Sequence, residues 1–404
     1  MNNNNVSQGT APRYPAFLSC GFRPFFLLGA IYAGLVIMVW LPVFYGELSM
    51  HTVFAPRDWH IHEMLYGYLP AIIAGFLFTA IPNWTGRAPI KDSPLLAMVL
   101  LWIAGRLAVT LSIDTGWLAA MIVDCSFLAM LIAVTAREVC ASGNWRNLKV
   151  IVVVGFLLAG NVAFHLETHF EGAADYSIRL GIGVIVFLLA LIAGRIIPAF
   201  TRNWLTRENP GRLPAQFALF DLTTLLFTIV ALVLWIAIPA SHITGAALLL
   251  AGALHAIRMG RWAGDRVLRD RLLLILHVGY AFLPLGFLLA GAGAFSLVPA
   301  SGGAHAWMVG GAGVMTLAVM TRASPGHTGR PLKASRAIEA IYAAVVVAAL
   351  ARICAAVHPA WSEHLLHIAA LAWVVAFFGF GAVFGPILLG EPKRKESAVQ
   401  ARAN

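Results

Sequence analysis

The sequence predicts an all-α protein, a polytopic bundle of about twelve transmembrane helices. Of its 404 residues, 60% are hydrophobic and only 11% are charged, whereas a typical soluble domain carries about 25% charged residues. The mean hydropathy is +0.81. Apolar runs of roughly 20 residues, the length that crosses about 30 Å of hydrocarbon, recur along the chain. This composition excludes an ordinary soluble protein and makes the lipid bilayer its first partner.

The chain divides into two tails and one membrane domain. Residues 1–22 form a polar N-terminal tail with a low-complexity Asn run, and it lacks the apolar segment of a cleavable signal. Residues 23–390 form the transmembrane domain, and residues 391–404 form a cytoplasmic C-terminal tail. Short connections leave no room for an inserted soluble domain. The twelve predicted spans are 24–45, 60–81, 94–111, 116–135, 149–167, 177–199, 214–238, 242–259, 271–292, 303–321, 336–357 and 364–389.

The basic residues predict the orientation of these spans. With the N-terminus in the cytoplasm, 23 of the 28 Lys and Arg residues fall in cytoplasmic segments. Only Arg57 and Arg179 fall outside, and Arg106, Arg195 and Arg352 lie within spans. This asymmetry follows the positive-inside rule, so both termini are expected to be cytoplasmic. The net charge of +10 then reflects topology and contact with anionic lipid, and no nucleic-acid partner is expected.

Three similar segments predict an internal repeat. They read IPNWTGRAP after span 2, IPAFTRNWL after span 6 and VMTRASPGHTGRPL after span 10. Thr85 and Thr201 are 116 residues apart, and Thr201 and Thr321 are 120 residues apart. Each interval equals four helices, which predicts three four-helix units. Inner loops that independently need Pro, Gly and Arg would explain the composition of these segments, although not their even spacing.

Twelve helices in three groups of four also resemble the main subunit of haem–copper oxidases, an analogy of architecture alone. That subunit has ligand histidines on its second, sixth, seventh and tenth helices, with one H-x-H that serves two haems. Here the H-x-H is on span 2 and a single histidine is on span 10, the reverse placement, and spans 6 and 7 carry no histidine. The chain is therefore not predicted to be such a subunit.

The segment DWHIHEMLYGY, residues 58–68, brings His60 and His62 to the start of the second span. Histidines at positions i and i+2 of a helix point about 200° apart, so one helix can supply ligands to two centres. Imidazole suits both haem iron and copper, and His305 lies at a similar depth at the start of span 10. The ordinary alternative is that these imidazoles face water at the membrane surface.

Other polar residues give further candidates. His165 and His169 share one helical face near the outer end of span 5, which suits either a copper half-site with two nitrogens or an exposed pair. His277 is either a deeper ligand or a residue hydrogen-bonded between helices. Arg106 and Asp124, on adjacent antiparallel spans, are candidates for a buried ion pair.

Proton transfer and anion binding would need their own side chains. Glu63 either relays protons or orients a ligating imidazole, unless it is a carboxylate favoured by a helix N-terminus. Tyr66 and Tyr68 are candidate proton carriers beside it. Arg195 either binds a carboxylate such as a haem propionate or extends to the inner surface.

The cysteines and short motifs exclude several classes of protein. The four cysteines form no C-x-x-C and no C-x-x-C-H, so neither a disulfide framework nor covalent haem attachment is expected. No P-loop, dinucleotide-binding glycine pattern or nucleic-acid module is present.

Five ordered motifs resemble those of the NnrS family. The motifs are GFRPFF at 21–26, WHIHEM at 59–64, GFLFTAIPNWTGR at 75–87, GRIIPAFTRN at 194–203 and HAWMVGGAGVMTLAVMTRASPGHTGR at 305–330. The resemblance implies a bacterial inner-membrane protein that contains haem b and copper and is linked to denitrification and tolerance of nitric oxide. His60, His62, His305 and His327 lie inside these motifs, and His277 lies in a segment that is also similar.

With this resemblance, His60, His62 and His305 are predicted to hold a non-covalent haem, with a copper on the other flank. The first functional hypothesis is that nitric oxide is reduced or otherwise consumed there, with electrons from a quinol or a redox protein. The second is a membrane transporter or handling protein for copper, haem or a small solute. A third, a membrane sensor, is weakened because no output domain is visible. The sequence alone leaves open whether the protein is an enzyme.

Overall fold

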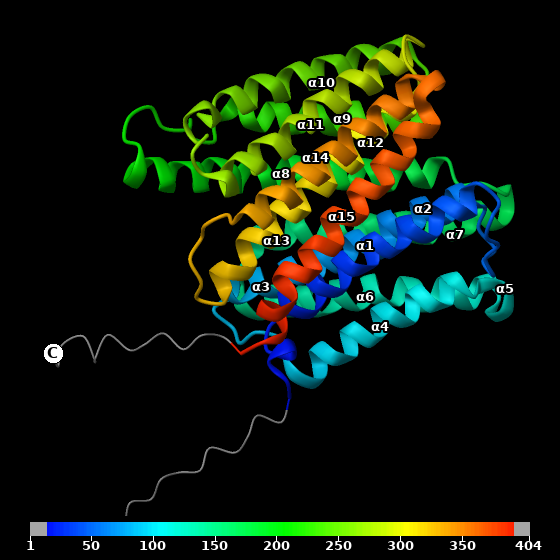
Figure 1. Cartoon of the computed structure of the whole chain (residues 1–404), viewed down its shortest axis with the longest axis horizontal. Coiled ribbons are helices and arrows are strands. Elements are labelled where there is room, and N and C mark those ends of the chain that lie inside the picture. The colour runs from blue at the N-terminus through cyan, green and yellow to red at the C-terminus, as the bar shows by residue number, and fades with distance from the viewer. Residues whose placement is uncertain (1–13, 392–404) are drawn as a thin grey trace, which may run out of the picture.

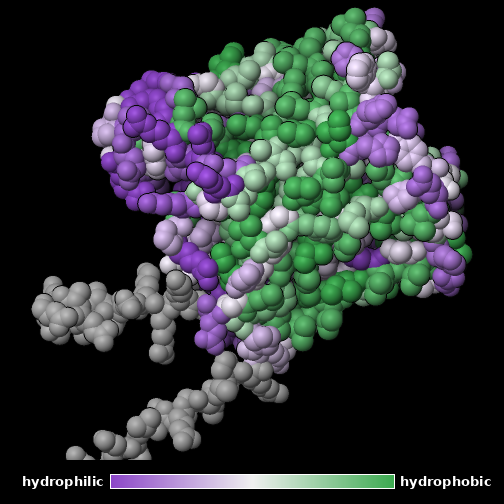
Figure 2. Space-filling view, in the orientation of Figure 1, coloured by the Kyte–Doolittle hydropathy of each residue, from purple (hydrophilic) through white to green (hydrophobic). Residues whose placement is uncertain are grey.

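The computed structural model describes residues 14–391, and the regular secondary structure over that range consists of helices with no strand, as predicted. Twelve helical segments are long and apolar enough to cross a membrane, so the chain is a multi-pass membrane protein. The helices run side by side between two ends of the bundle (Figure 1), and a hydrophobic band separates two hydrophilic ends (Figure 2). Most of the two predicted tails lies outside the described residues.

The first four spans pack together. α1 packs against α3, and α4 packs against α6. α2, the π-helix η2 and α3 form one continuous span that starts at Pro56, four residues before the predicted start, because proline is well tolerated at the first helical position. The elements are η1 (Ala16–Leu18), α1 (Phe22–Phe44), α2 (Pro56–His62), η2 (Glu63–Tyr68), α3 (Leu69–Thr85), α4 (Asp92–Thr110), α5 (Ser112–Thr115) and α6 (Trp117–Ser142).

The next four spans extend the bundle on one side. α6 packs against α7, α7 against α8, α8 against α9, and α9 against α10. The elements are η3 (Trp145–Asn147), α7 (Leu148–Glu171), α8 (Tyr176–Glu208), α9 (Leu219–Ala237), α10 (His242–Gly260) and η4 (Gly264–Arg266).

The last four spans close the bundle. α11 packs against α10, α8 and α13, and α15 packs against both α14 and α1, so the last helix lies beside the first (Figure 1). The elements are α11 (Arg271–Ala294), α12 (Ser301–His305), the π-helix η5 (Ala306–Gly313), α13 (Val314–His327), α14 (Arg336–Val357), η6 (Pro359–Trp361) and α15 (Ser362–Leu389).

Two π-helical turns mark the two most buried spans. η2 directly follows His62, and η5 directly follows His305, and these spans are the most deeply buried of the twelve. π-helical turns are rare and frequently lie at functional sites. The sequence did not predict either of them. Each widens its helix immediately beside a candidate ligand.

The three similar segments largely form the ends of helices α3, α8 and α13, and only residues 86–89 and 328–332 of them lie in loops, where the sequence suggested them. Pro82, Pro198 and Pro325 all lie inside these helices. The hydroxyls of Thr85 and Thr321 each donate to the carbonyl four residues earlier at 2.8 Å, a pattern that helices accommodate. Membrane helices tolerate proline because neighbouring groups satisfy the freed carbonyls. The three helix ends lie at the same end of the bundle.

Candidate metal centre

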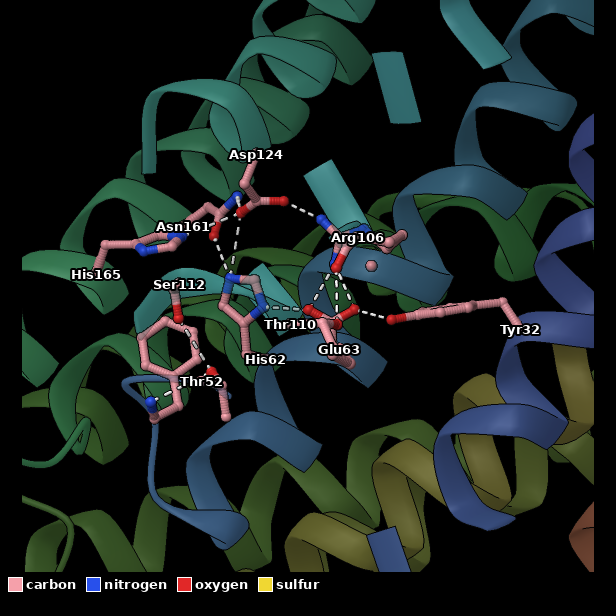
Figure 3. A network of polar contacts seen from close by, with 12 residues as sticks. Tyr32, Thr52, His62, Glu63, Arg106, Thr110, Ser112, Asp124, Asn161 and His165 are labelled. Carbon is pink, nitrogen blue, oxygen red and sulfur yellow. Dashed lines mark hydrogen bonds and ion pairs between the residues drawn. The ribbon is translucent and has the colours of Figure 1, made fainter. Parts of the chain in front are cut away.

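Seven side chains from five spans form one buried polar cluster (Figure 3). We call this set the buried cluster. It lies at the end of the bundle opposite to the three similar segments. Its members are Tyr32 of α1, His62 of α2, Glu63 of η2, Arg106 of α4, Asp124 of α6, and Asn161 and His165 of α7.

One guanidinium joins the two carboxylates of the cluster. Nη1 of Arg106 donates to both carboxylate oxygens of Glu63, at 2.8 and 2.7 Å. Its Nη2 donates to Asp124, so the ion pair predicted between Arg106 and Asp124 is confirmed. Gly67 makes room for this contact, because a Cβ there would lie 2.5 Å from Nη1 of Arg106. The hydroxyl of Tyr32 donates to Glu63 from the other side.

His62 lies between the two carboxylates. Its Nδ1 is 2.9 Å from Oε1 of Glu63. Its Nε2 is 3.0 Å from Oδ1 of Asn161 and 3.2 Å from Oδ2 of Asp124. Nε2 of His165 lies 3.2 Å from the same oxygen of Asp124. One ligand atom each from His62, Asp124 and His165 therefore lies within 4.8 Å of the others, and all three residues are buried.

The cluster carries an unbalanced charge. Two carboxylates, Glu63 and Asp124, face the single guanidinium of Arg106, so neutral imidazoles leave one negative charge in excess. Uncompensated charge in a membrane interior is costly, and a bound cation or a proton would offset it. Two imidazole nitrogens and one carboxylate oxygen form a donor set that suits copper, and also zinc or iron.

A loop closes the cluster at its end of the bundle. The ring of Phe54 lies 5.1 Å from that of His62 and 5.2 Å from that of His165, and Phe54 is only 5% exposed. The loop is fixed by Ser112, whose hydroxyl accepts from the backbone N–H of Val53 at 2.9 Å. The histidines are therefore covered by an aromatic side chain and do not open directly to water.

His60 points to the other flank of the same helix, as the i, i+2 spacing predicts. It stacks on Trp40, with ring centroids 4.3 Å apart, and its buried Nδ1 has no hydrogen-bond partner among the described residues. His305 lies close enough to His60 for their charges to interact, and the guanidinium of Arg352 interacts electrostatically with both imidazoles. Nδ1 of His305 lies 2.7 Å from the carbonyl of Ser301, a contact that leaves Nε2 free for a ligand.

Several predicted residues lie away from these two flanks. His169 stacks on Trp117 with ring centroids 3.9 Å apart, so it does not join His165 in the buried cluster. Nε2 of His277 lies 3.0 Å from the hydroxyl of Thr201, near the opposite end of the bundle. This is the interhelical hydrogen bond that the sequence left as one of two alternatives.

Tyr66 and Arg195 are also placed differently from what the roles expected for them require. Tyr66 lies beside His62, with ring centroids 5.5 Å apart, but its hydroxyl donates to the carbonyl of Ser177. The hydroxyl that contacts Glu63 belongs to Tyr32. Arg195 lines a cavity at the opposite end of the bundle, far along the helices from His60.

A second buried network provides a contrast. Asp221 pairs with Arg258 and Arg261, so guanidinium groups outnumber the carboxylate there. Both nitrogens of His255 are occupied, by the hydroxyl of Tyr280 at 2.8 Å and that of Thr228 at 2.9 Å. This network satisfies its own polar groups and has no excess negative charge to attract a cation.

Sequence reasoning missed Asn161 and Tyr32. Asn161 lies four residues before His165, on the same helical face, which is a signal that the sequence contains. Tyr32 lies in the middle of an otherwise apolar first span, where a phenol needs a hydrogen-bond partner. Asp124 was considered only as a partner for Arg106, because its distance from His62 depends on the packing of α6 against the span of α2, η2 and α3.

Comparison with known proteins identifies the family. The model of the NnrS family, described as NnrS protein, matches residues 16–391. No curated protein sequence is similar enough to serve as a relative. Because the family match covers nearly the whole chain, the chain belongs to the NnrS family.

Proposed function

We propose that this member of the NnrS family binds copper and haem in the bacterial inner membrane and that it binds and consumes nitric oxide at the buried metal centre. The observation that carries the proposal is the donor set of His62, Asp124 and His165 within 4.8 Å. This set lies in a cluster with one excess negative charge. A site of this kind is more stable with a bound cation than without one.

In this proposal His62, Asp124 and His165 hold the copper ion. Glu63 accepts from Nδ1 of His62, which fixes the tautomer and leaves Nε2 to bind metal, the usual role of a carboxylate behind a ligating histidine. Arg106 holds both carboxylates in place. When bound, copper supplies a redox-active Lewis acid that polarises a small ligand. Because metal binding displaces protons from its ligands, copper affinity should fall as the pH falls.

The haem would bind on the other flank, through His60 and His305. Nδ1 of His60 has no hydrogen-bond partner among the described residues, and Nε2 of His305 is the ring nitrogen that its contact with Ser301 leaves over. Each histidine lies just before a π-helical turn. Arg352 supplies the cation that a haem propionate needs on this flank, a role that the sequence had suggested for Arg195. The absence of C-x-x-C-H means that this haem would be non-covalent.

The closure of the cluster favours a resident metal over a transported one. A transporter must expose its cargo site to water, whereas Phe54 covers His62 and His165. Nitric oxide is small and uncharged, so it can reach a closed site through apolar walls. Tyr32 and Glu63 form a hydrogen-bonded pair that can supply a proton to the cluster. Electrons would come from a quinol or a redox protein.

The test is to purify the full chain from bacteria supplied with haem and copper. We expect copper by elemental analysis, an extractable b-type haem by absorption, and anaerobic consumption of nitric oxide by the reduced protein. Copper that exchanges within seconds with added copper, without consumption of nitric oxide, would support the transporter instead. A protein that contains neither metal would refute the proposal.

A further inference from the structure

A cavity of about 620 Å³ lies at the end of the bundle opposite to the buried cluster. The three similar segments of the sequence converge on it from α3, α8 and α13. α3 contributes Trp84, α8 contributes Arg195 and Phe200, and α13 contributes Arg322 and His327. The repeated segments thus share one location in space, which the proposed metal chemistry does not use.

The polar part of the cavity is cationic. Lys149, Arg195 and Arg322 line it, and none of the described residues that line it is acidic. Within residues 14–391, no carboxylate lies at ion-pair distance from these three cations. The guanidinium of Arg322 instead lies over the ring of Phe200, 4.5 Å from its centroid.

Other arginines at this end of the bundle are paired with carboxylates. Arg87 donates to Glu138 at 2.5 Å, and Arg212 donates to Asp265 at 2.6 Å. The pairing with Arg212 holds the pKa of Asp265 below its usual value. Arg202 and Arg207, also at this end, contact backbone carbonyls instead, so unpaired cations are not peculiar to the cavity. The cavity differs in that its three cations line a largely apolar hollow.

Most of the remaining lining of the cavity is apolar. The cavity adjoins a second cavity of about 90 Å³ that α3, α8 and α13 also line. Phe76, Ile196 and Val319 are shared by both. The deeper cavity reaches Thr316, whose hydroxyl lies 2.5 Å from that of Tyr68. A ligand that fills this space must have a long apolar body.

We propose that the cavity binds an amphipathic anion, with its apolar body between α3, α8 and α13 and its carboxylate or phosphate on Lys149, Arg195 and Arg322. Cations without protein partners recognise the acidic group by charge-assisted hydrogen bonds. The aromatic and aliphatic walls bury the apolar body. An anionic lipid and a tetrapyrrole carboxylate share this chemistry.

The test uses the full chain in neutral detergent and a fluorescent 18-carbon polyene carboxylate as the probe. We compare the wild type with an R195Q/R322Q double variant and with R207Q, a matched control at an exposed arginine of the same helix. The double variant should bind at least about tenfold more weakly, the effect of losing one charge-assisted contact, and R207Q should bind like the wild type. The corresponding polyene alcohol should bind weakly to all three proteins.

An R195K/R322K variant separates loss of charge from loss of fold. It keeps both cations and should keep binding close to that of the wild type, with an unchanged unfolding midpoint. Mass spectrometry of the molecules that copurify distinguishes a lipid from a tetrapyrrole, and depletion of either one in the double variant supports the site. Equal binding of the acid by the wild type and the double variant, or of acid and alcohol by the wild type, would overturn the proposal.

Discussion

Replacing Asp124 by Asn should remove copper, whereas replacing Glu63 by Gln should only weaken it. Both changes remove one negative charge from the buried cluster, and both leave one carboxylate facing Arg106. The loss of fold stability should therefore be similar, on the order of 3 kcal/mol for lost hydrogen bonds to a charged group. The two residues differ in their position relative to the metal donors. Asp124 belongs to the donor set, whereas Glu63 contacts Nδ1 of His62 and not the metal position.

The magnitudes follow from these positions. Loss of a carboxylate that orients a ligating histidine typically costs 10–100-fold in metal affinity, or about 1.4–2.8 kcal/mol. Glu63→Gln should fall in this range. Asp124→Asn removes one of three donors, so its loss should exceed about 100-fold.

The assay is copper bound per polypeptide after equilibration with chelators of graded affinity. Each variant is first shown to be monodisperse, and its unfolding midpoint is compared with that of the wild type. Equal copper affinity in Asp124→Asn and in the wild type would refute the assignment. Equal losses in the two variants would mean that only the charge of the cluster matters and that Asp124 is not a ligand.

Three further predictions test the flanks, the topology and the packing. His60→Ala and His305→Ala should lower haem content, while His62→Ala should spare haem and lower copper. The measurement is haem and copper per polypeptide, with the exposed His51→Ala as the control. Unchanged haem and copper in all three variants would exclude these histidines as ligands. A reporter fused after Asn404 should be active only if it is a type that folds in the cytoplasm, and activity of a periplasmic reporter there would invert the topology. Gly67→Ala should destabilise the protein by about 3–5 kcal/mol, because its Cβ would displace Arg106 from Glu63. A Cβ at Gly155 would have nothing within 4 Å, so Gly155→Ala should cause no loss of stability. Thermal unfolding in detergent compares the two variants, and equal unfolding midpoints would contradict the role of Gly67.

The membrane architecture could be predicted because it depends on local properties. Each span is an apolar run of sufficient length, and the predicted spans lie almost entirely within helical segments of the structure, except that the span predicted at 214–238 starts five residues before α9. The opposite directions of His60 and His62 follow from helix geometry alone. Pro82 of α3 and Pro325 of α13 lie beyond the ends of their predicted spans, whereas Pro198 of α8 lies inside its predicted span. Sequence reasoning treats proline as a helix breaker and cannot see the neighbours that satisfy the freed carbonyls.

The composition of the candidate site could be predicted only in part. His62 and His165 were candidates because histidine is unusual in a span, but the partner assigned to His165 was His169, its neighbour on the helix surface. The actual partner, Asp124, comes from α6 and is brought close by packing between helices. Such contacts depend on helix rotation and depth, which the hydrophobic pattern of a nearly uniformly apolar span does not specify.

Anaerobic consumption of nitric oxide by the reduced protein tests the central claim most directly when His165→Ala is compared with His169→Ala. The two histidines lie one helical turn apart on α7, but only His165 faces Asp124, while His169 stacks on Trp117. The account predicts that His165→Ala loses both copper and nitric oxide consumption and that His169→Ala retains both. Equal rates of consumption in the two variants, with both proteins folded, would contradict it.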